Sequence, residues 1–300
     1  KAGFIYAALF SSLSVLLAAY AVWDKNFYSF CLACFFIGNG MAFTHQYRFA
    51  AAESVEKSFI PKALSIIMLA SIFSALLGPN IANFNKDLIS GHLFVGSYLS
   101  LAVLTFIPVI FLSFYSPKAE LARDKEYKGR GYFKLILQPS FLQAVVSAAF
   151  AYAVMSFLMT ATPINMHVIE NYSLNKTGIV IQLHIVSMFL PSLITGNLLR
   201  KYGHSKIIYA GVSFFVLTIL LSFLPPSFFN YLFSLVFLGI GWNFLYLSGT
   251  GLLVLSYREE EKFKAQGFND ILVFSTQALA SLSAGYMLSM TSWKTMNLIA

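Results

Sequence analysis

The chain has 300 residues, of which 58% are hydrophobic and only 11% are charged. A soluble domain carries about 25% charged residues and could not bury this much apolar surface, so the composition excludes a water-soluble globular fold. The net charge of +8 would suit nucleic acid in a soluble protein, but in this chain it indicates basic residues held on the cytoplasmic side of a membrane, and we expect no nucleic-acid partner.

Nine apolar stretches follow one another, each close to the roughly 20 residues that a helix needs to cross a bilayer. In chain order they are Phe4–Trp23, Phe30–Phe49, Ala63–Ile81, Phe94–Phe114, Phe141–Pro163, Ile179–Leu199, Ile207–Leu224, Tyr231–Leu255 and Ile271–Met290. A tenth begins at Trp293 and runs to Ala300. These stretches lack the alternation of a membrane β-barrel, so the sequence predicts an all-α, multi-pass membrane protein.

The basic residues indicate the orientation of the spans. If the chain starts on the cytoplasmic face, sixteen Lys and Arg residues lie inside, and only Lys25, Lys86, Lys176 and Lys294 lie outside. Because Lys and Arg are enriched in cytoplasmic loops, this split predicts a cytoplasmic start and supports the number of spans. We expect the protein in a bacterial inner membrane, as a monomer.

The longest polar stretch, residues 116–140, falls on the cytoplasmic side and contains the run KAELARDKEYKGRGYFK. We interpret it as a solvated linker rather than a binding tail. The predicted organisation is an N-terminal helical bundle over residues 1–115, a cytoplasmic linker over residues 116–140 and a C-terminal bundle over residues 141–300.

The sequence gives little support to enzymatic chemistry. It contains no His-rich metal spacing, no phosphate-cradling loop and no nucleophile elbow, so we expect neither an enzyme nor a cofactor. The two cysteines, Cys31 and Cys34, lie in an apolar stretch. There we expect buried small apolar side chains rather than a disulfide, redox or metal pair.

A short internal repeat links the two predicted bundles. Residues 35–43 (FFIGNGMAF) recur as residues 236–244 (VFLGIGWNF), so that Gly38 and Gly40 align with Gly239 and Gly241. A repeat of this separation in a membrane protein indicates two related helical halves, which is an architecture of transporters.

The stretch GNLLRKYGHSK, Gly196 to Lys206, resembles the cytoplasmic loop signature of the major facilitator superfamily. Gly196, Gly203 and the basic Lys201 match that signature, whereas Arg200 stands where the family usually has Asp. The resemblance implies two bundles of six helices. By the same alignment the first two spans precede Lys1, so the chain holds spans three to eleven and the start of the twelfth.

Two further segments extend the resemblance. Five residues match the spacing of the family's antiporter motif in the fifth helix: Ser65, Ser74, Gly78, Pro79 and Ala82. The motif has Gly at the two positions that Ser65 and Ser74 occupy here. Members with this motif are often proton-coupled exporters. The Arg that precedes the Gly pair in the fourth helix of such exporters is absent from Leu32-Ala33-Cys34. The segment Gly241 to Asp270 resembles a poorly characterised bacterial subgroup.

Polar side chains inside apolar spans are costly unless they face a cavity or a partner, so they are candidates for a substrate pathway. The candidates are Gln143, Tyr152, Gln182, His184, Trp242, Asn243, Tyr246 and Gln277. Two alternatives stay open. Asn243 either contacts solute or forms a hydrogen bond between helices, and His184 either carries a proton or packs between helices.

A second set of residues lies at span ends or at glycine and proline positions where helices bend or pack closely, and we assign it to gating and coupling. It comprises His45, Arg48, Glu53, Gly78, Pro79, Gly196, Arg200, Gly203 and Asp270. Asp270 is expected to begin a helix, where its carboxylate would favour the positive end of the helix dipole. A proton-carrying role for Asp270 is the alternative.

The function implied is secondary transport of a small, weakly polar organic solute by alternating access, as proton-coupled export. A highly charged solute would require Arg or Lys at mid-depth, and the spans contain neither residue at that depth. Import or facilitated passage of a metabolite is one alternative. A membrane sensor or assembly factor on the same scaffold is another.

Overall fold

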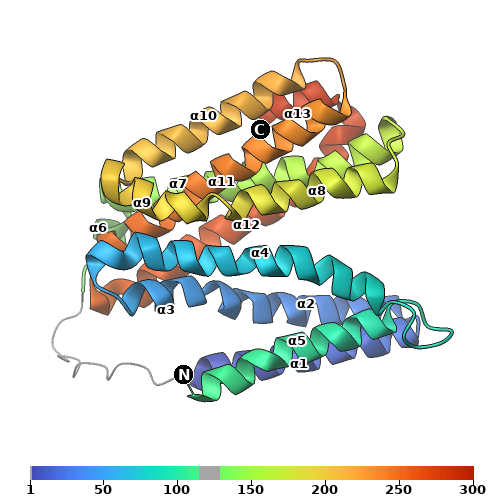
Figure 1. The fold of residues 1–300 in the computed structure, drawn as a ribbon. Helices are drawn as coiled ribbons and strands as arrows, with labels where there is room; N and C mark the ends of the chain where they lie inside the picture. Colours follow the sequence, from blue (N-terminus) through green and yellow to red (C-terminus); the bar gives the residue numbers. More distant parts are fainter. Residues whose placement is uncertain (1, 115–128) are drawn as a thin grey trace. The chain divides into compact units, whose positions relative to one another are not determined.

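The computed structural model describes residues 2–114 and 129–300, in which every regular element is helical (Figure 1). The helices are α1 (Ala2–Trp23), α2 (Phe27–His45), α3 (Tyr47–Glu53), α4 (Ile60–Phe84), α5 (Val95–Phe114), α6 (Tyr132–Ile136), α7 (Pro139–Pro163), α8 (Leu174–Phe189), α9 (Ser192–Tyr202), α10 (His204–Ser222), α11 (Phe228–Ser256), α12 (Lys262–Met290) and α13 (Trp293–Ile299). Short 3₁₀ turns cover Lys57–Phe59 and Glu259–Glu261, and a π-helical turn covers Ile164–Ile169.

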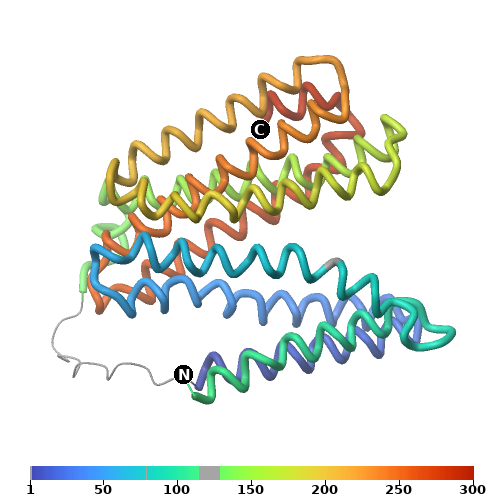
Figure 2. The backbone as a smooth tube through the Cα atoms, viewed as in Figure 1, coloured from blue at the N-terminus to red at the C-terminus, as the bar shows by residue number. Residues whose placement is uncertain are grey.

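Nine helical segments among the described residues are long and apolar enough to cross a bilayer. Each overlaps one of the nine predicted stretches over most of its length, and α13 begins at Trp293 as expected. The all-α, multi-pass fold class is therefore confirmed. Figure 2 shows the chain reversing direction between α1 and α2 and again between α10 and α11. Residues 116–128 of the predicted linker lie outside the described residues, and its described end contains α6.

Side-chain caps explain where several helices start. Asn26 precedes α2 and its side chain accepts the backbone N–H of Ser29 at 3.0 Å. Ser227 does the same for α11, accepting the N–H of Asn230 at 3.2 Å. Pro139 occupies the first turn of α7, where a missing N–H costs nothing. These residues let the helices start before the apolar stretches that the sequence marks.

The helices divide into two compact units, and the division falls within α3 and α4. Unit 1 comprises Lys1–Ala50 and Phe73–Arg123, and unit 2 comprises Ala51–Ile72 and Asp124–Ala300. In unit 1, α1 packs against both α2 and α5. In unit 2, α11 packs against α7, α8 and α10, while α12 packs against α7. Helix α11 is therefore the central element of unit 2.

The repeated glycines mark the same kind of contact in each unit. In unit 1, a Cβ atom on Gly40 of α2 would collide with the side chain of Ser11 on α1. In unit 2, a Cβ atom on Gly241 of α11 would lie 2.9 Å from the carbonyl oxygen of Gly211 on α10. Since α2 and α11 carry the two copies of the repeat, each copy uses its second glycine for close helix packing.

Three expectations are corrected. The stretch Ile179–Leu199 is two helices, α8 and α9, separated at Leu190 and Pro191 because proline cannot continue the hydrogen-bond ladder. Asp270 does not begin a helix: α12 starts eight residues earlier, because the polar turn Glu259–Glu261 leads directly into Lys262. Cys31 and Cys34 are exposed rather than buried, because α2 turns little of its surface toward other helices.

We predict that Gly241→Ala destabilises the protein. The added methyl would meet the Phe215 ring at 2.6 Å and the Gly211 carbonyl at 2.9 Å, and overpacking of this kind costs about 1–3 kcal/mol. The measurement is the apparent melting temperature in detergent. Gly267→Ala in α12 is the matched control, because a Cβ there meets nothing within 4 Å and should leave the melting temperature unchanged or higher.

Candidate functional site

Tyr152 of α7 and four further aromatic side chains of unit 2 form one connected group of rings. The Tyr152 ring meets Trp242 and Tyr246 of α11 edge-on, with centroid distances of 5.3 Å and 5.0 Å. It meets Phe274 of α12 at 5.8 Å. Trp242 and Tyr246 stack at 4.8 Å, and Phe189 at the end of α8 lies 5.7 Å from Trp242. We call these five residues the aromatic cluster.

The aromatic cluster lies near the middle of the membrane-length segments that carry it. Tyr152 is the fourteenth of 25 residues in α7, and Trp242 is the fifteenth of 29 residues in α11. At 1.5 Å per residue, both are roughly 20 Å from either helix end. Four helices thus place aromatic rings at the depth where secondary transporters bind their substrates.

Trp242 carries an unused hydrogen-bond donor. The residue is only 2% exposed, and its Nε1 has no hydrogen-bond partner among the described residues. A buried polar group without a partner is costly and calls for an explanation. This N–H is therefore a hydrogen-bond donor without a partner in the described part of the chain, and it lies within the aromatic cluster.

Next to Trp242, Asn243 connects α11 to the interruption between α8 and α9. Its Nδ2 donates to the Met188 carbonyl at 2.7 Å and to Ser192 Oγ at 2.8 Å. Its Oδ1 lies 2.8 Å from Thr195 Oγ1. Of the two interpretations left open, this geometry matches the hydrogen bond between helices.

His184 also joins α8 to α11. Its side chain is fully buried, and Nδ1 lies 2.7 Å from the Leu235 carbonyl oxygen, so Nδ1 carries the proton. One turn further along α11, a Cβ on Gly239 would lie 2.8 Å from the His184 carbonyl. The contacts are those of a packing histidine.

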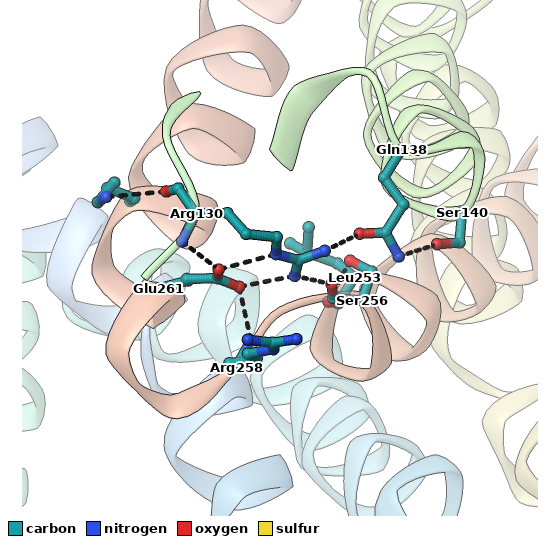
Figure 3. Close-up of polar contacts among 8 residues, drawn as sticks. Arg130, Gln138, Ser140, Leu253, Ser256, Arg258 and Glu261 are labelled. Carbon is teal, nitrogen blue, oxygen red and sulfur yellow. Dashed lines mark hydrogen bonds and ion pairs between the residues drawn. The ribbon is translucent and has the colours of Figure 1, made fainter. Parts of the chain in front are cut away.

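A polar cluster occupies the place where the chain enters α7 and passes from α11 to α12 (Figure 3). The buried Glu261 carboxylate accepts the Arg130 backbone N–H at 2.7 Å and its Nε at 2.8 Å on Oε1. Its Oε2 accepts Arg130 Nη2 at 2.7 Å and the Arg258 backbone N–H at 3.0 Å. This paired geometry is the strong form of an Arg–carboxylate contact.

Arg130 extends the same cluster to neighbouring elements. Nη1 donates to Gln138 Oε1 at 2.6 Å just before α7, and Nη2 donates to the Ser256 carbonyl at 3.0 Å at the end of α11. The Arg130 carbonyl accepts Lys264 Nζ at 3.2 Å. One arginine therefore joins the described end of the predicted linker to α7, α11 and α12.

Glu53 belongs to a neighbouring polar group in unit 2. Gln266 Nε2 donates to Glu53 Oε1 at 2.6 Å, and Tyr257 Oη donates to the same oxygen at 3.1 Å. Lys262 Nζ lies 3.6 Å from Glu53 Oε2. Burial, and then the negative charge of Glu53, raise the pKa of Tyr257. The phenol therefore stays protonated and remains a donor to Glu53.

The remaining pathway candidates lie apart from the aromatic cluster or at its edge. Gln143 is near the start of α7, where its Oε1 accepts Ser205 Oγ at 3.1 Å. Gln182 on α8 and Gln277 on α12 are half-buried. Near Gln277, Ser281 shares a hydrogen bond of 3.0 Å with Thr160 of α7.

The gating candidates occupy several places. Gly203, with φ of +82°, forms the turn between α9 and α10, and a Cβ on Gly196 would meet Ser65 Oγ at 2.6 Å. The Arg200 guanidinium lies 5.8 Å from the Phe59 ring centroid. In unit 1, Gly78 and the backbone of Pro79 belong to α4, and His45 is the last residue of α2. Arg48 is buried, with its guanidinium 4.5 Å from the centroid of the Phe49 ring.

Sequence reasoning missed two parts of this arrangement. Arg130 and Glu261 are 131 residues apart, and no periodicity connects them. Phe189 looks like any apolar residue in a span. Pro191 within the same span was the available signal that the helix is interrupted there. Among residues 2–114 and 129–300, no group of three or more His, Cys, Asp and Glu residues is arranged to hold a metal ion.

We predict that Glu261→Gln lowers the stability of unit 2. The amide cannot accept paired hydrogen bonds from a guanidinium, and hydrogen bonds to charged groups contribute about 1.5–3 kcal/mol each. The apparent melting temperature should fall by several degrees. Glu260→Gln removes the same charge from an exposed neighbour and should not change it. Equal effects of the two variants would contradict the prediction.

Comparison with known proteins identifies the fold. A model described as Major Facilitator Superfamily matches residues 1–281. The solved structure of the major facilitator FucP in an outward conformation has a TM-score of 0.70 over 100% of this chain and 79% of that one. A bacterial homologue of the iron transporter ferroportin, in an outward-facing state, gives 0.68 over 99% and 79%. Sequence identities are 16% and 12%, so these likenesses show the fold alone.

Two curated proteins are more similar in sequence. The riboflavin transporter RfnT of Brucella anthropi is 32% identical over 297 residues, which cover 98% of this chain and 74% of that protein. The uncharacterized MFS-type transporter YddS of Bacillus subtilis is 27% identical over 310 residues, covering 97% and 67%. This family consists of transporters rather than enzymes, in agreement with the expectation from the sequence. With a family model matched over nearly its whole length and a relative at 32% identity, the chain belongs to the major facilitator superfamily of multi-pass membrane transporters.

Proposed function

We propose that this transporter carries a planar, uncharged heteroaromatic solute of the riboflavin class, which stacks on the aromatic cluster during transport. The carrying observation is the group of five rings at mid-depth, centred on Tyr152 and Trp242. Flat rings gain about 0.5–1.5 kcal/mol from stacking beyond the area that they bury. The Trp242 Nε1, which lacks a partner among the described residues, is suited to a carbonyl acceptor on such a ring.

The charge distribution supports the same class of solute. Lys and Arg residues of unit 2 lie near helix ends, for example Lys176 in α8, Lys201 in α9 and Lys264 in α12. The middle turns of α7 and α11 contain neither residue type. A phosphorylated solute would need such a cation at mid-depth, whereas a neutral flavin would not. The similarity to a protein named riboflavin transporter agrees with this chemistry.

Transport would follow alternating access between two helical bundles. We propose that residues 1–115 and 141–300 are these bundles and that residues 116–140 form a cytoplasmic linker. The sixteen-to-four distribution of Lys and Arg supports this orientation. We further propose that the transporter works as a monomer in a bacterial inner membrane and exports its solute in exchange for protons. Asp270, a half-buried carboxylate in the third turn of α12, is the proposed proton-binding group.

We predict that purified protein in detergent quenches the fluorescence of riboflavin, because stacking on Trp and Tyr rings quenches flavin emission. Trp242→Leu removes the central ring and should raise the dissociation constant roughly tenfold, which corresponds to about 1.4 kcal/mol. Trp293→Leu is the matched control, since Trp293 packs against Tyr231 outside the aromatic cluster. Tight riboflavin binding by the Trp242→Leu variant would contradict the proposal.

Proton coupling and direction require sealed vesicles of known orientation. If export is coupled to protons, an acidic vesicle interior should drive riboflavin into the vesicles through transporters in the inside-out orientation. Asp270→Asn should abolish this effect of the pH gradient, while riboflavin exchange at equal pH on both sides continues. Asp24→Asn, at an exposed position just after α1, is the control. Gradient-driven movement in the opposite direction would establish import, and movement without a gradient effect would establish facilitated passage.

A further inference from the structure

We infer that Asn243 is a positioning residue of the aromatic cluster: its amide fixes the interruption between α8 and α9 against α11 and thereby sets the contact of Phe189 with Trp242. This inference rests on the proposed function, because it assigns Asn243 a role in shaping the solute site. Asn243 itself touches no solute in this scheme.

The interruption between α8 and α9 leaves backbone carbonyl groups that need a hydrogen-bond donor from elsewhere in the protein. Pro191 has no N–H, so the ladder of backbone hydrogen bonds cannot run from α8 into α9. After Pro191, Leu193 N–H donates to the Leu190 carbonyl at 3.1 Å and Ile194 N–H donates to the Pro191 carbonyl at 2.9 Å. The hydrocarbon region offers no water, so backbone groups at the interruption must find partners in the protein. The Met188 carbonyl finds one in Asn243 Nδ2, at 2.7 Å.

Asn243 is suited to this task by its position on α11. Four residues earlier on the same face, a Cβ on Gly239 would lie 3.0 Å from the Met188 backbone nitrogen, so the α8 and α11 backbones approach closely. A short amide can therefore reach across. Asn243 is 1% exposed, and both ends of its amide are engaged, by Ser192 Oγ and Thr195 Oγ1, each at 2.8 Å.

The same two chain segments carry the rings. Trp242 precedes Asn243, and Phe189 follows Met188, so the amide–carbonyl bond and the ring contact are one residue apart on both helices. The Phe189 and Trp242 rings meet edge-on, with an interplanar angle of 81°. A shift of the α8 end relative to α11 would move this contact directly. The Asn243 bond thus controls the shape of the surface on which a flat solute would stack.

The alternative is that Asn243 only joins two helices and has no influence on the aromatic cluster. Thr218 provides a matched comparison because it is buried and its Oγ1 lies 3.1 Å from the Ser234 carbonyl, between α10 and α11. Thr218→Val removes a polar contact of α11 with nearly no change in size. A purely structural role predicts the same consequences for Asn243→Leu and Thr218→Val.

The first readout is independent of any solute. The chain has three tryptophans, and Trp23→Phe with Trp293→Phe leaves Trp242 as the single reporter. In that background, Asn243→Leu should shift the Trp242 emission maximum and increase its quenching by acrylamide at least twofold, whereas Thr218→Val should change neither. Unchanged emission in folded Asn243→Leu protein, or equal changes in both variants, would overturn the inference.

The second readout is riboflavin binding in the otherwise unchanged chain. Asn243→Leu should raise the dissociation constant roughly tenfold, and Thr218→Val less than twofold. If Asn243→Leu does not fold, Ser192→Ala removes one of the Asn243 contacts and should give smaller changes in the same direction; no change would overturn the inference. If the unaltered chain binds no riboflavin, the proposed function fails, and the emission measurement alone decides whether Asn243 positions Trp242.

Discussion

The hydrocarbon interior of a membrane supplies no water, so each backbone polar group must be satisfied within the protein, and this constraint shapes unit 2. Continuous helices satisfy it without help. The interruption at Leu190 and Pro191 does not, and Asn243 of α11 makes it tolerable by donating to the Met188 carbonyl. The close approach at Gly239 allows that short reach. The position of α11 against α8, and with it the arrangement of the aromatic cluster, depends on this contact.

The two polar groups, around Glu261 and Glu53, lie where helices end rather than within the aromatic interior. Their hydrogen bonds and ion pairs join segments that are far apart in the sequence. Arg130 contacts elements at the ends of α7, α11 and α12 at once, so the described end of the predicted linker is fixed to unit 2. Unit 2 thus combines charged contacts where α11 ends and α12 begins with an uncharged aromatic interior, in agreement with the neutral flat solute that we propose.

Much of the candidate site was visible in the sequence. Four polar or amphipathic residues stand out in the apolar helices: Tyr152, Trp242, Asn243 and Tyr246. Polar side chains there cost free energy unless they face a cavity or a partner. The sequence did not show that three of them form a cluster of rings while Asn243 joins two helices. Periodicity shows which residues share a face of one helix, but it does not show which other helix packs against that face. Asp270 illustrates the same limit: the apolar stretch predicted a helix start at Asp270, whereas α12 already begins at Lys262, so that Asp270 lies in its third turn.

The sequence by itself determined the membrane environment, the number of membrane-length helical segments and the family, because hydropathy and glycine spacing are local properties. It also indicated the turn at Gly203. Only the tertiary structure decided which residues meet: Phe189 with Trp242, Asn243 with Met188, and Arg130 with Glu261. These pairs are separated by 53, 55 and 131 positions, and they meet because packed helices bring distant turns to the same depth. No local pattern in the chain encodes that depth.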